Sequence, residues 1–210
     1  MRGAPPATDT APAAAGAVPR AGAPADDDDR SLAERASRDG EAFAQLYRRY
    51  VGAIYEFAYR RSRSRDLAED VTSATFEKAL GALERFEWRR GGFRAWIYRI
   101  AANELTDQFR RRQRDSTPRA QRTLQALGAG NEGALETVDA RLDAETGRVM
   151  EALAALRPRY QEALSLRFLA GLSLAEAATA LGCSRGTMAV VVHRALAALR
   201  RELALQEVVA

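Results

Sequence analysis

Apolar side chains recur every three or four residues along much of this chain, which is the spacing of an amphipathic helix. The first such segment covers residues 43–58. A second segment opens at "DLAE", where Asp66 and Glu69 have the form of a capping box at a helix start. After Gly91 and Gly92 the same pattern runs through residues 93–109. The chain is therefore predicted to build its core between helices.

Four more helices are predicted in the C-terminal part, "EALAALRPRYQEALSLRFLAGLSLAEAATALGCSRGTMAVVVHRALAALRREL". Pro158 suits the first turn of the second of these helices. Ser173 and Glu176 form a capping box for a short third helix, and a tight turn then leads to Ser184, which opens the last one. A short helix, a glycine-containing turn and a longer helix are typical of a helix-turn-helix, whose second helix enters the major groove of DNA.

Composition divides the chain into two folded parts. We expect an all-α fold of two small helical domains joined by a flexible linker, since 210 residues can build two modest cores. The predicted segments are a disordered Ala/Pro/Asp-rich tail at 1–30, a first domain at 31–114, a linker at 115–147 and a second domain at 148–210. The run Asp26–Asp29 is interpreted as solvated linker; the alternative is that it folds back over a basic surface. No segment reads as a secretory signal or membrane span, so a cytoplasmic protein without membrane contact is expected.

The positive charge is concentrated in one stretch. The formal net charge is +4, but residues 85–114 alone hold nine arginines and three acids, a net charge of +6. Aromatic rings lie among these arginines: Phe86, Trp88, Phe93, Trp96, Tyr98 and Phe109. This mixture indicates a surface that holds a nucleic-acid backbone and stacks unpaired bases. The alternative is that the rings belong to the core and the arginines to a solvated face, and for Phe93 and Phe109, on the apolar stripe, the core is favoured.

Residue counts argue against an enzyme. Cys183 is the only cysteine and His193 the only histidine. One chain therefore has no internal disulfide, no cysteine-cluster metal site and no histidine-based catalytic triad. We expect no catalytic residue, no bound metal and no cofactor.

The sequence resembles a known family, the bacterial RNA polymerase sigma factors of the extracytoplasmic-function (ECF) type. The resemblance covers about residues 41–114 and 148–203. Its most specific stretches are "DLAEDVTSATFEKAL", "FRAWIYRIAANELTDQFRRR" and "GLSLAEAATALGCSRGTMAVVVHRAL", in the order of the family. It implies that the first domain is a sigma region 2 helical bundle and the second a sigma region 4 helix-turn-helix.

The resemblance also implies partners and functions for particular residues. A sigma factor binds core RNA polymerase at the beta-prime clamp helices and the beta flap, recognises the −35 and −10 promoter elements and promotes melting of promoter DNA for transcription initiation; an anti-sigma factor is a possible further partner. Polymerase contacts are implied for Asp66, Glu69, Asp70, Ser73, Glu77 and Lys78. Contacts with −10 DNA are implied for Trp96, Arg99, Asn103, Thr106, Arg110, Arg111 and Arg112. Contacts with −35 DNA are implied for Ser184, Arg185, Thr187, His193, Arg194 and Arg200.

The chain departs from the family pattern at two places. Ser73-Ala74 stands where the family commonly has Gln-Glu, and Ala189 and Val191 stand where it usually has a lysine and an arginine. Two other functions therefore stay open. One is a helix-turn-helix transcription regulator without sigma activity, and the other is a protein-interaction adaptor with a degenerate DNA-reading helix.

The last helix contains an unusually apolar run. Met188, Val192, Ala195 and Leu199 share one helical face and are predicted to be buried. The run 189–191 is expected to lie outside that face, where it would meet either thymine methyl groups or a protein partner.

Overall fold

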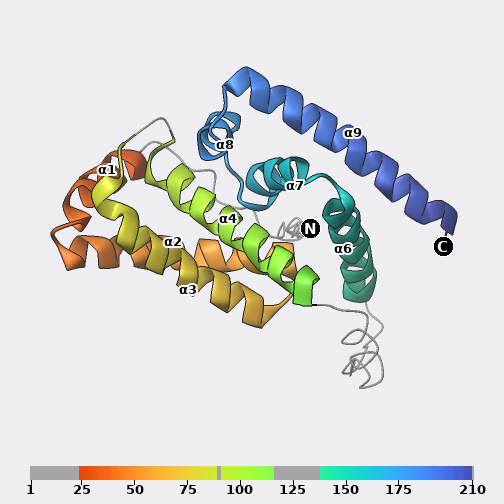
Figure 1. Cartoon of the computed structure of the whole chain (residues 1–210), viewed down its shortest axis with the longest axis horizontal. Coiled ribbons are helices and arrows are strands. Elements are labelled where there is room, and N and C mark those ends of the chain that lie inside the picture. The colour runs from red at the N-terminus through yellow and green to blue at the C-terminus, as the bar shows by residue number, and fades with distance from the viewer. Residues whose placement is uncertain (1–23, 89–90, 116–137, 210) are drawn as a thin grey trace, which may run out of the picture.

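The structure is a computed structural model, and it describes residues 24–88, 91–115 and 138–209. These residues form helices and no strand, which confirms the all-α prediction. The helices are α1 (Pro24–Ala36), α2 (Gly40–Ser62), α3 (Arg65–Ala82), η1 (Leu83–Arg85), α4 (Gly92–Asp115), α6 (Val138–Ala155), α7 (Pro158–Leu164), η2 (Ser165–Leu169), α8 (Leu174–Ala180) and α9 (Arg185–Val209). We call α1–α4 the first domain and α6–α9 the second domain (Figure 1).

The start of α3 corrects one sequence prediction. The N-cap is Ser64, whose backbone is extended and whose Oγ accepts a hydrogen bond from the Leu67 amide at 3.3 Å. Asp66 is therefore not a cap but lies inside the first turn, where its negative charge still favours the positive end of the helix dipole. The capping box predicted at Asp66 and Glu69 is wrong, because Ser64, two residues earlier, accepts the hydrogen bond from the otherwise unpaired backbone amide of Leu67.

Helix α1 lies partly within the predicted tail. It begins at Pro24, and two residues of the acidic run hold it against α2. Asp29 is 3% exposed, accepts a hydrogen bond from the Tyr50 hydroxyl and pairs with Arg49, which also binds the more exposed Asp28. Burial and the Asp29 carboxylate both raise the pKa of Tyr50. The interpretation of this run as solvated linker is thus wrong for Asp28 and Asp29, while residues 1–23 lie outside the described residues.

The second domain follows the predicted order of helices. Pro158 occupies the first turn of α7, which continues into a short π-helical segment, η2. Ser173 and Glu176 form the predicted capping box at α8. The amide of Thr187 donates to Ser184 Oγ at 3.0 Å, so Ser184 caps α9. Helices α8 and α9 with the turn between them form the predicted helix-turn-helix.

The two domains share one core. Figure 1 shows α4 between α2 and α3 on one side and α7 and α8 on the other. Phe93 and Ile97 of α4 belong to the same buried cluster as Leu166, Leu172 and Met188 of the second domain. Helix α6 begins at Val138, so the predicted linker 115–147 is helical over its last ten residues. The rest of the predicted flexible linker, residues 116–137, lies outside the described residues.

Candidate nucleic-acid and partner interfaces

The predicted polymerase-binding residues form one exposed face of α3. The opposite face is buried, with Leu67, Val71 and Phe76 in the first-domain core. All six predicted residues are exposed: Asp66, Glu69, Asp70, Ser73, Glu77 and Lys78. Lys78 also forms an ion pair across to Glu104 of α4, which is 3% exposed. The face is therefore acidic and accessible, and Lys78 at its end is partly committed to holding α3 against α4.

Five of the seven predicted −10 residues lie on the outward side of α4. This helix buries one apolar side in the core, including Phe93, Ile97 and Leu105. The exposed members of the predicted set are Arg99, Asn103, Arg110, Arg111 and Arg112, whereas Trp96 and Thr106 are half-buried. The apolar side thus fixes the rotation of α4 and directs Asn103 and the arginines outward.

Two of the six aromatic rings among the arginines are core residues, and the other four are half-buried against the core. Phe93 is 0% and Tyr98 is 4% exposed. Trp96 packs its ring on Phe86 and Phe93, with ring centroids 4.8 and 5.3 Å apart. Phe93 is thus a core residue, as its place on the apolar stripe predicted, and the stacking interpretation is wrong for Tyr98. Trp96 retains an accessible edge on the same side as Arg99.

The predicted −35 residues lie at the start and along one side of α9. All six are exposed: Ser184, Arg185, Thr187, His193, Arg194 and Arg200. Ser184 and Thr187 are also bonded to each other, with their hydroxyl oxygens 2.9 Å apart. The side chains that could read base edges are thus few, and two of them already form the cap of the helix.

The apolar run in α9 is divided between surface and core. Met188 and Ala195 are fully buried, as predicted, while Val192 and Leu199 are half-buried against the core. Ala189 and Val190 are exposed, and Val190 is 49% accessible. Val191, however, is half-buried and packs against the shared core. The expectation that Val191 lies outside the buried face is wrong. The shared core covers a wider arc of α9 than the spacing of its apolar residues indicates.

A groove joins the two candidate DNA surfaces. It has a volume of about 610 Å³, and Trp96 and Arg99 of α4 line it together with Gly182 and Cys183 of the turn between α8 and α9. The start of α9, with Ser184 and the residues after it, follows directly from this turn. Trp96 and Arg99 of the −10 set thus lie beside the turn that leads into α9, which their separation along the chain did not predict.

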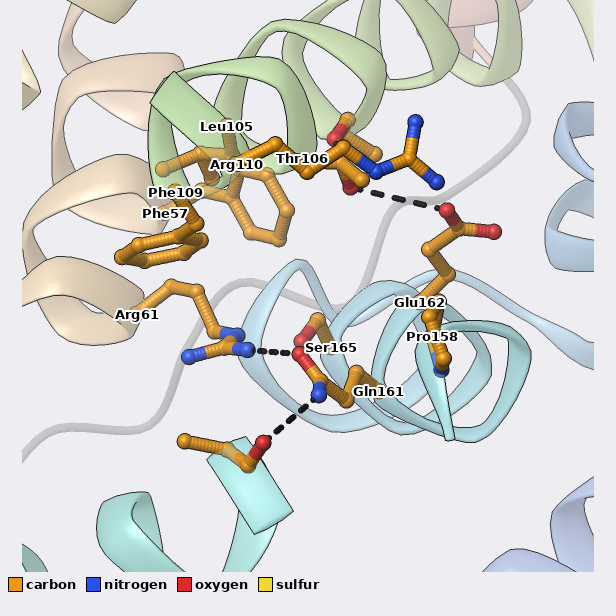
Figure 2. A pocket seen from close by; sticks show the side chains of 12 residues that line it. Phe57, Arg61, Leu105, Thr106, Phe109, Arg110, Pro158, Gln161, Glu162 and Ser165 are labelled. Atoms are coloured by element: carbon orange, nitrogen blue, oxygen red, sulfur yellow. Dashed lines mark hydrogen bonds between the residues drawn. The ribbon is translucent and has the colours of Figure 1, made fainter. Parts of the chain in front are cut away.

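A cavity of about 340 Å³ lies further along the same domain contact, between α4 and α7 (Figure 2). Arg61 of α2 stands over the Phe109 ring at 4.8 Å and donates a hydrogen bond to Gln161 of α7. Burial lowers the pKa of Arg61 to about 10. On the other side of the cavity Thr106 lies 3.5 Å from Glu162, whose pKa is raised by burial.

Sequence reasoning missed Arg61, Gln161 and Glu162 as contact residues. Arg61 stands in an arginine-rich helix end that is typical of solvent, but Phe109 of α4 and Gln161 of α7 cover it. Among the described residues no group of three or more His, Cys, Asp or Glu side chains could hold a metal ion. No helix among them is long and apolar enough to cross a membrane.

Comparison with known proteins matches both domains. Residues 46–115 match the family Sigma-70 region 2, and residues 146–199 match Sigma-70, region 4. The chain is 34% identical over 174 residues to the ECF RNA polymerase sigma factor BldN of Streptomyces coelicolor; the match covers 82% of this chain and 64% of BldN, so the chain spans less than two thirds of that relative. It is 31% identical over 179 residues to the ECF RNA polymerase sigma factor SigD of Mycobacterium tuberculosis, covering 83% of each chain.

A solved structure supports the same assignment. The RNA polymerase sigma factor CnrH of Cupriavidus metallidurans is 35% identical to this chain over 181 residues, covering 83% of this chain and 93% of CnrH. The structure of CnrH in complex with the cytosolic domain of CnrY aligns with a TM-score of 0.61 over 85% of this chain and 99% of that one, at 30% identity. With both sigma regions in order and relatives matched over most of their length, this chain belongs to the RNA polymerase sigma factors of the ECF type.

Proposed function

We propose that this chain directs core RNA polymerase to promoters and helps to open them. The observation that carries the proposal is the separation of two exposed surfaces on the first domain. The acidic face of α3 is free for a protein, and the outward side of α4 presents arginines and Asn103 for DNA. A protein surface and a DNA surface on one small bundle are what a factor that links polymerase to a promoter requires.

In this proposal the first domain captures melted −10 DNA. Extruding a base costs a few kcal/mol in lost stacking. Stacking on the Trp96 edge, worth about 1–3 kcal/mol per base, and hydrogen bonds to the Asn103 amide offset that cost. The arginines at 110–112 hold strand phosphates, and the polymerase supplies the chemistry. The chain therefore needs no catalytic residue, metal or cofactor for this function.

The second domain contributes contact with the −35 element through α9. Arg194 and Arg200 would bind phosphates, while Arg185 and His193 would reach base edges. Ala189 and Val190 are exposed residues near the start of α9, and they are apolar. We therefore propose that contacts with the −35 element contribute less to promoter binding than contacts with the −10 element. The exposed pair would touch thymine methyl groups or a protein. A sigma factor with these partners would act in the cytoplasm.

A regulatory protein is a further proposed partner. CnrH, a relative of this chain, has been solved with the cytosolic domain of CnrY bound. We propose that this chain also binds an inhibitory protein of the anti-sigma kind. Pull-down from cells carrying the tagged chain, with and without competing core polymerase, tests this: an inhibitor should appear only when core is not in excess.

Transcription from a genomic library of promoter fragments, with purified core polymerase and this chain, tests the proposed function. We expect the chain to direct initiation at a defined set of fragments that core alone does not use. A pure regulator would bind duplex DNA without activating core alone, and a protein adaptor would bind core without selecting fragments. Either of these results would contradict the proposal that this chain acts as a sigma factor.

A further inference from the structure

The cavity between α4 and α7 has the size and the lining of a small-molecule site. Its volume of about 340 Å³ lies within the range of roughly 300–1,000 Å³ that ligand pockets occupy. Phe57 and Phe109 belong to its apolar wall, and Arg61 and Ser165 add polar groups. Ligand pockets combine an apolar lining with a few polar groups in this way, and they form preferentially where domains or helices of a bundle meet.

Arg61 places a buried positive charge at this cavity. The residue is 8% exposed, lies over the Phe109 ring and donates a hydrogen bond to Gln161. Among the described residues no carboxylate pairs with it, and Glu162, the one carboxylate of the lining, lies across the cavity beside Thr106 (Figure 2). Burial lowers the pKa of Arg61 to about 10, so the side chain stays charged at neutral pH. Because buried charges are normally paired, Arg61 offers a place for an anion.

A second polar group at the cavity has a free hydrogen-bonding hydroxyl. Ser165 is 4% exposed, and its hydroxyl has no partner among the described residues. It lies one helical turn after Gln161 and opens the π-helical segment η2, in which the Ala170 amide donates to the Ser165 carbonyl at 3.0 Å. Such wide turns are rare and frequently lie at functional sites. The Ser165 hydroxyl can therefore donate to an oxygen of a bound molecule.

We propose that this cavity binds a small amphipathic monocarboxylate, whose carboxylate lies between Arg61 and Ser165 and whose apolar body lies against Phe57 and Phe109. A carboxylate matches the planar fork of a guanidinium with two hydrogen bonds, whereas a cationic ligand would meet like charge. The ligand would contact α2 and α4 of the first domain and η2 of the second. The proposal does not depend on the proposed function, because none of these four residues belongs to the sets assigned to polymerase or DNA.

Octanoate tests the site in the full-length chain. Octanamide and octylamine have the same carbon chain with a neutral and a cationic head group, and titration calorimetry measures the affinity of each. Octanoate should bind at a single site about tenfold or more tightly than octanamide, because only the anion forms a charge-assisted pair with the buried guanidinium. Octylamine should bind more weakly than both.

A variant of Arg61 separates a binding function from a structural one. Arg61→Gln keeps a polar side chain but removes the charge, so it should abolish the preference for octanoate over octanamide. Arg60→Gln makes the same change at the adjacent arginine, which pairs with Glu56, and should keep that preference. Since the preference is a ratio of two affinities of one variant, a general loss of stability does not imitate its disappearance.

Ser165→Ala guards against misfolding of the Arg61 variant. Removing a buried hydroxyl that has no partner should leave the free energy of unfolding of the free chain unchanged or slightly raised. The same change should weaken octanoate binding by about tenfold, the usual worth of a hydrogen bond to a charged group. Urea denaturation and calorimetry measure the two effects separately.

Four results would overturn the proposal. They are no saturable binding of octanoate, equal affinities of the parent for octanoate and octanamide, a preference for octanoate that survives Arg61→Gln, and an octanoate affinity that Ser165→Ala leaves unchanged. None of these measurements involves core polymerase or promoter DNA, so failure of the parent to support transcription would instead count against the proposed function.

Discussion

At the scale of single residues, Asn103 is the exposed amide in the middle of the outward side of α4. We predict that Asn103→Ala lowers promoter melting, read with a single-strand-specific probe, by about tenfold, because a base captured there loses its hydrogen bonds. Affinity for core polymerase should not change. Gln45→Ala, which removes an exposed amide from α2, is the control and should melt promoters like the parent. Unchanged melting by Asn103→Ala together with weaker duplex binding would reject base capture.

Asp29 supports a second prediction at this scale. It is buried and bonded to Tyr50 and Arg49, whereas the neighbouring Asp28 is 59% exposed. Asp29→Asn should lower the free energy of unfolding by about 1.5–3 kcal/mol, the usual worth of a hydrogen bond to a charged group. Asp28→Asn should cost less than about 1 kcal/mol, as exposed ion pairs do. Urea denaturation compares the two, and equal losses would show that α1 is not held through Asp29.

At the scale of elements, α3 carries its negative charge on one exposed face. Reversing Asp70 and Glu77 to lysine should weaken binding to core polymerase by about tenfold or more, because a basic clamp surface would then meet like charge. Reversal of Glu56 and Glu84, two exposed acids outside this face, changes the net charge equally and should have little effect. A fluorescence titration with core polymerase measures the affinity of both double variants. Equal affinities would contradict the prediction that polymerase binds the exposed face of α3.

Helix α9 allows a test of its exposed apolar pair. Ala189→Lys with Val190→Arg should add phosphate contacts and steepen the log-log salt dependence of duplex binding by about one to two units. Val191 is kept, since it is half-buried and a charge there would disturb the core. The titration uses the full chain, because both domains share one core. An unchanged slope would indicate that these two residues face a protein instead of DNA.

Short-range sequence patterns predicted the helices that are determined by residues within or next to the helix itself. The apolar period gave α2, α3 and α4, and Pro158 and Ser173 marked helix starts because each acts within its own turn. Helix α1 was missed because its acidic residues are held by Arg49 and Tyr50, about twenty residues away. The exposure of the α3 face and of Asn103 followed from the period alone. The burial of Val191 and Arg61 did not, since it depends on contacts made by distant helices.

At the scale of the whole molecule, the domain contact should be sensitive to acid. Burial alone would raise the pKa of Glu176, but hydrogen bonds from Ser173 and the charge of Arg94 outweigh it, so the pKa is lowered from its ordinary 4.5. A carboxylate with a lowered folded-state pKa adds stability above its unfolded pKa and loses it as the pH falls through the folded value. The parent should therefore be more stable than Glu176→Gln near neutral pH, and this difference should shrink below about pH 4.5.

Urea denaturation from about pH 7 to about pH 3.5 measures that difference. Glu151→Gln, at an exposed position of α6, is the control and should track the parent throughout. A gap between parent and Glu176→Gln that persists unchanged at the acid end would mean that the negative charge of Glu176, held by Ser173 and Arg94, does not stabilise the fold. Burial of Glu162, which lies against Thr106 further along α4, raises its pKa and acts in the opposite direction, so the comparison is made between variants and not between pH values alone.

The position of the tryptophans has a practical consequence. The chain has only two, Trp88 and Trp96; both pack on Phe86, and Phe86 and Trp96 line the groove against the second domain. Indole emission shifts to longer wavelength when water reaches the ring, so the native chain carries its own optical reporter at the place where the domains meet. A stopped-flow measurement of this emission during urea unfolding then times the loss of the domain contact without any attached dye.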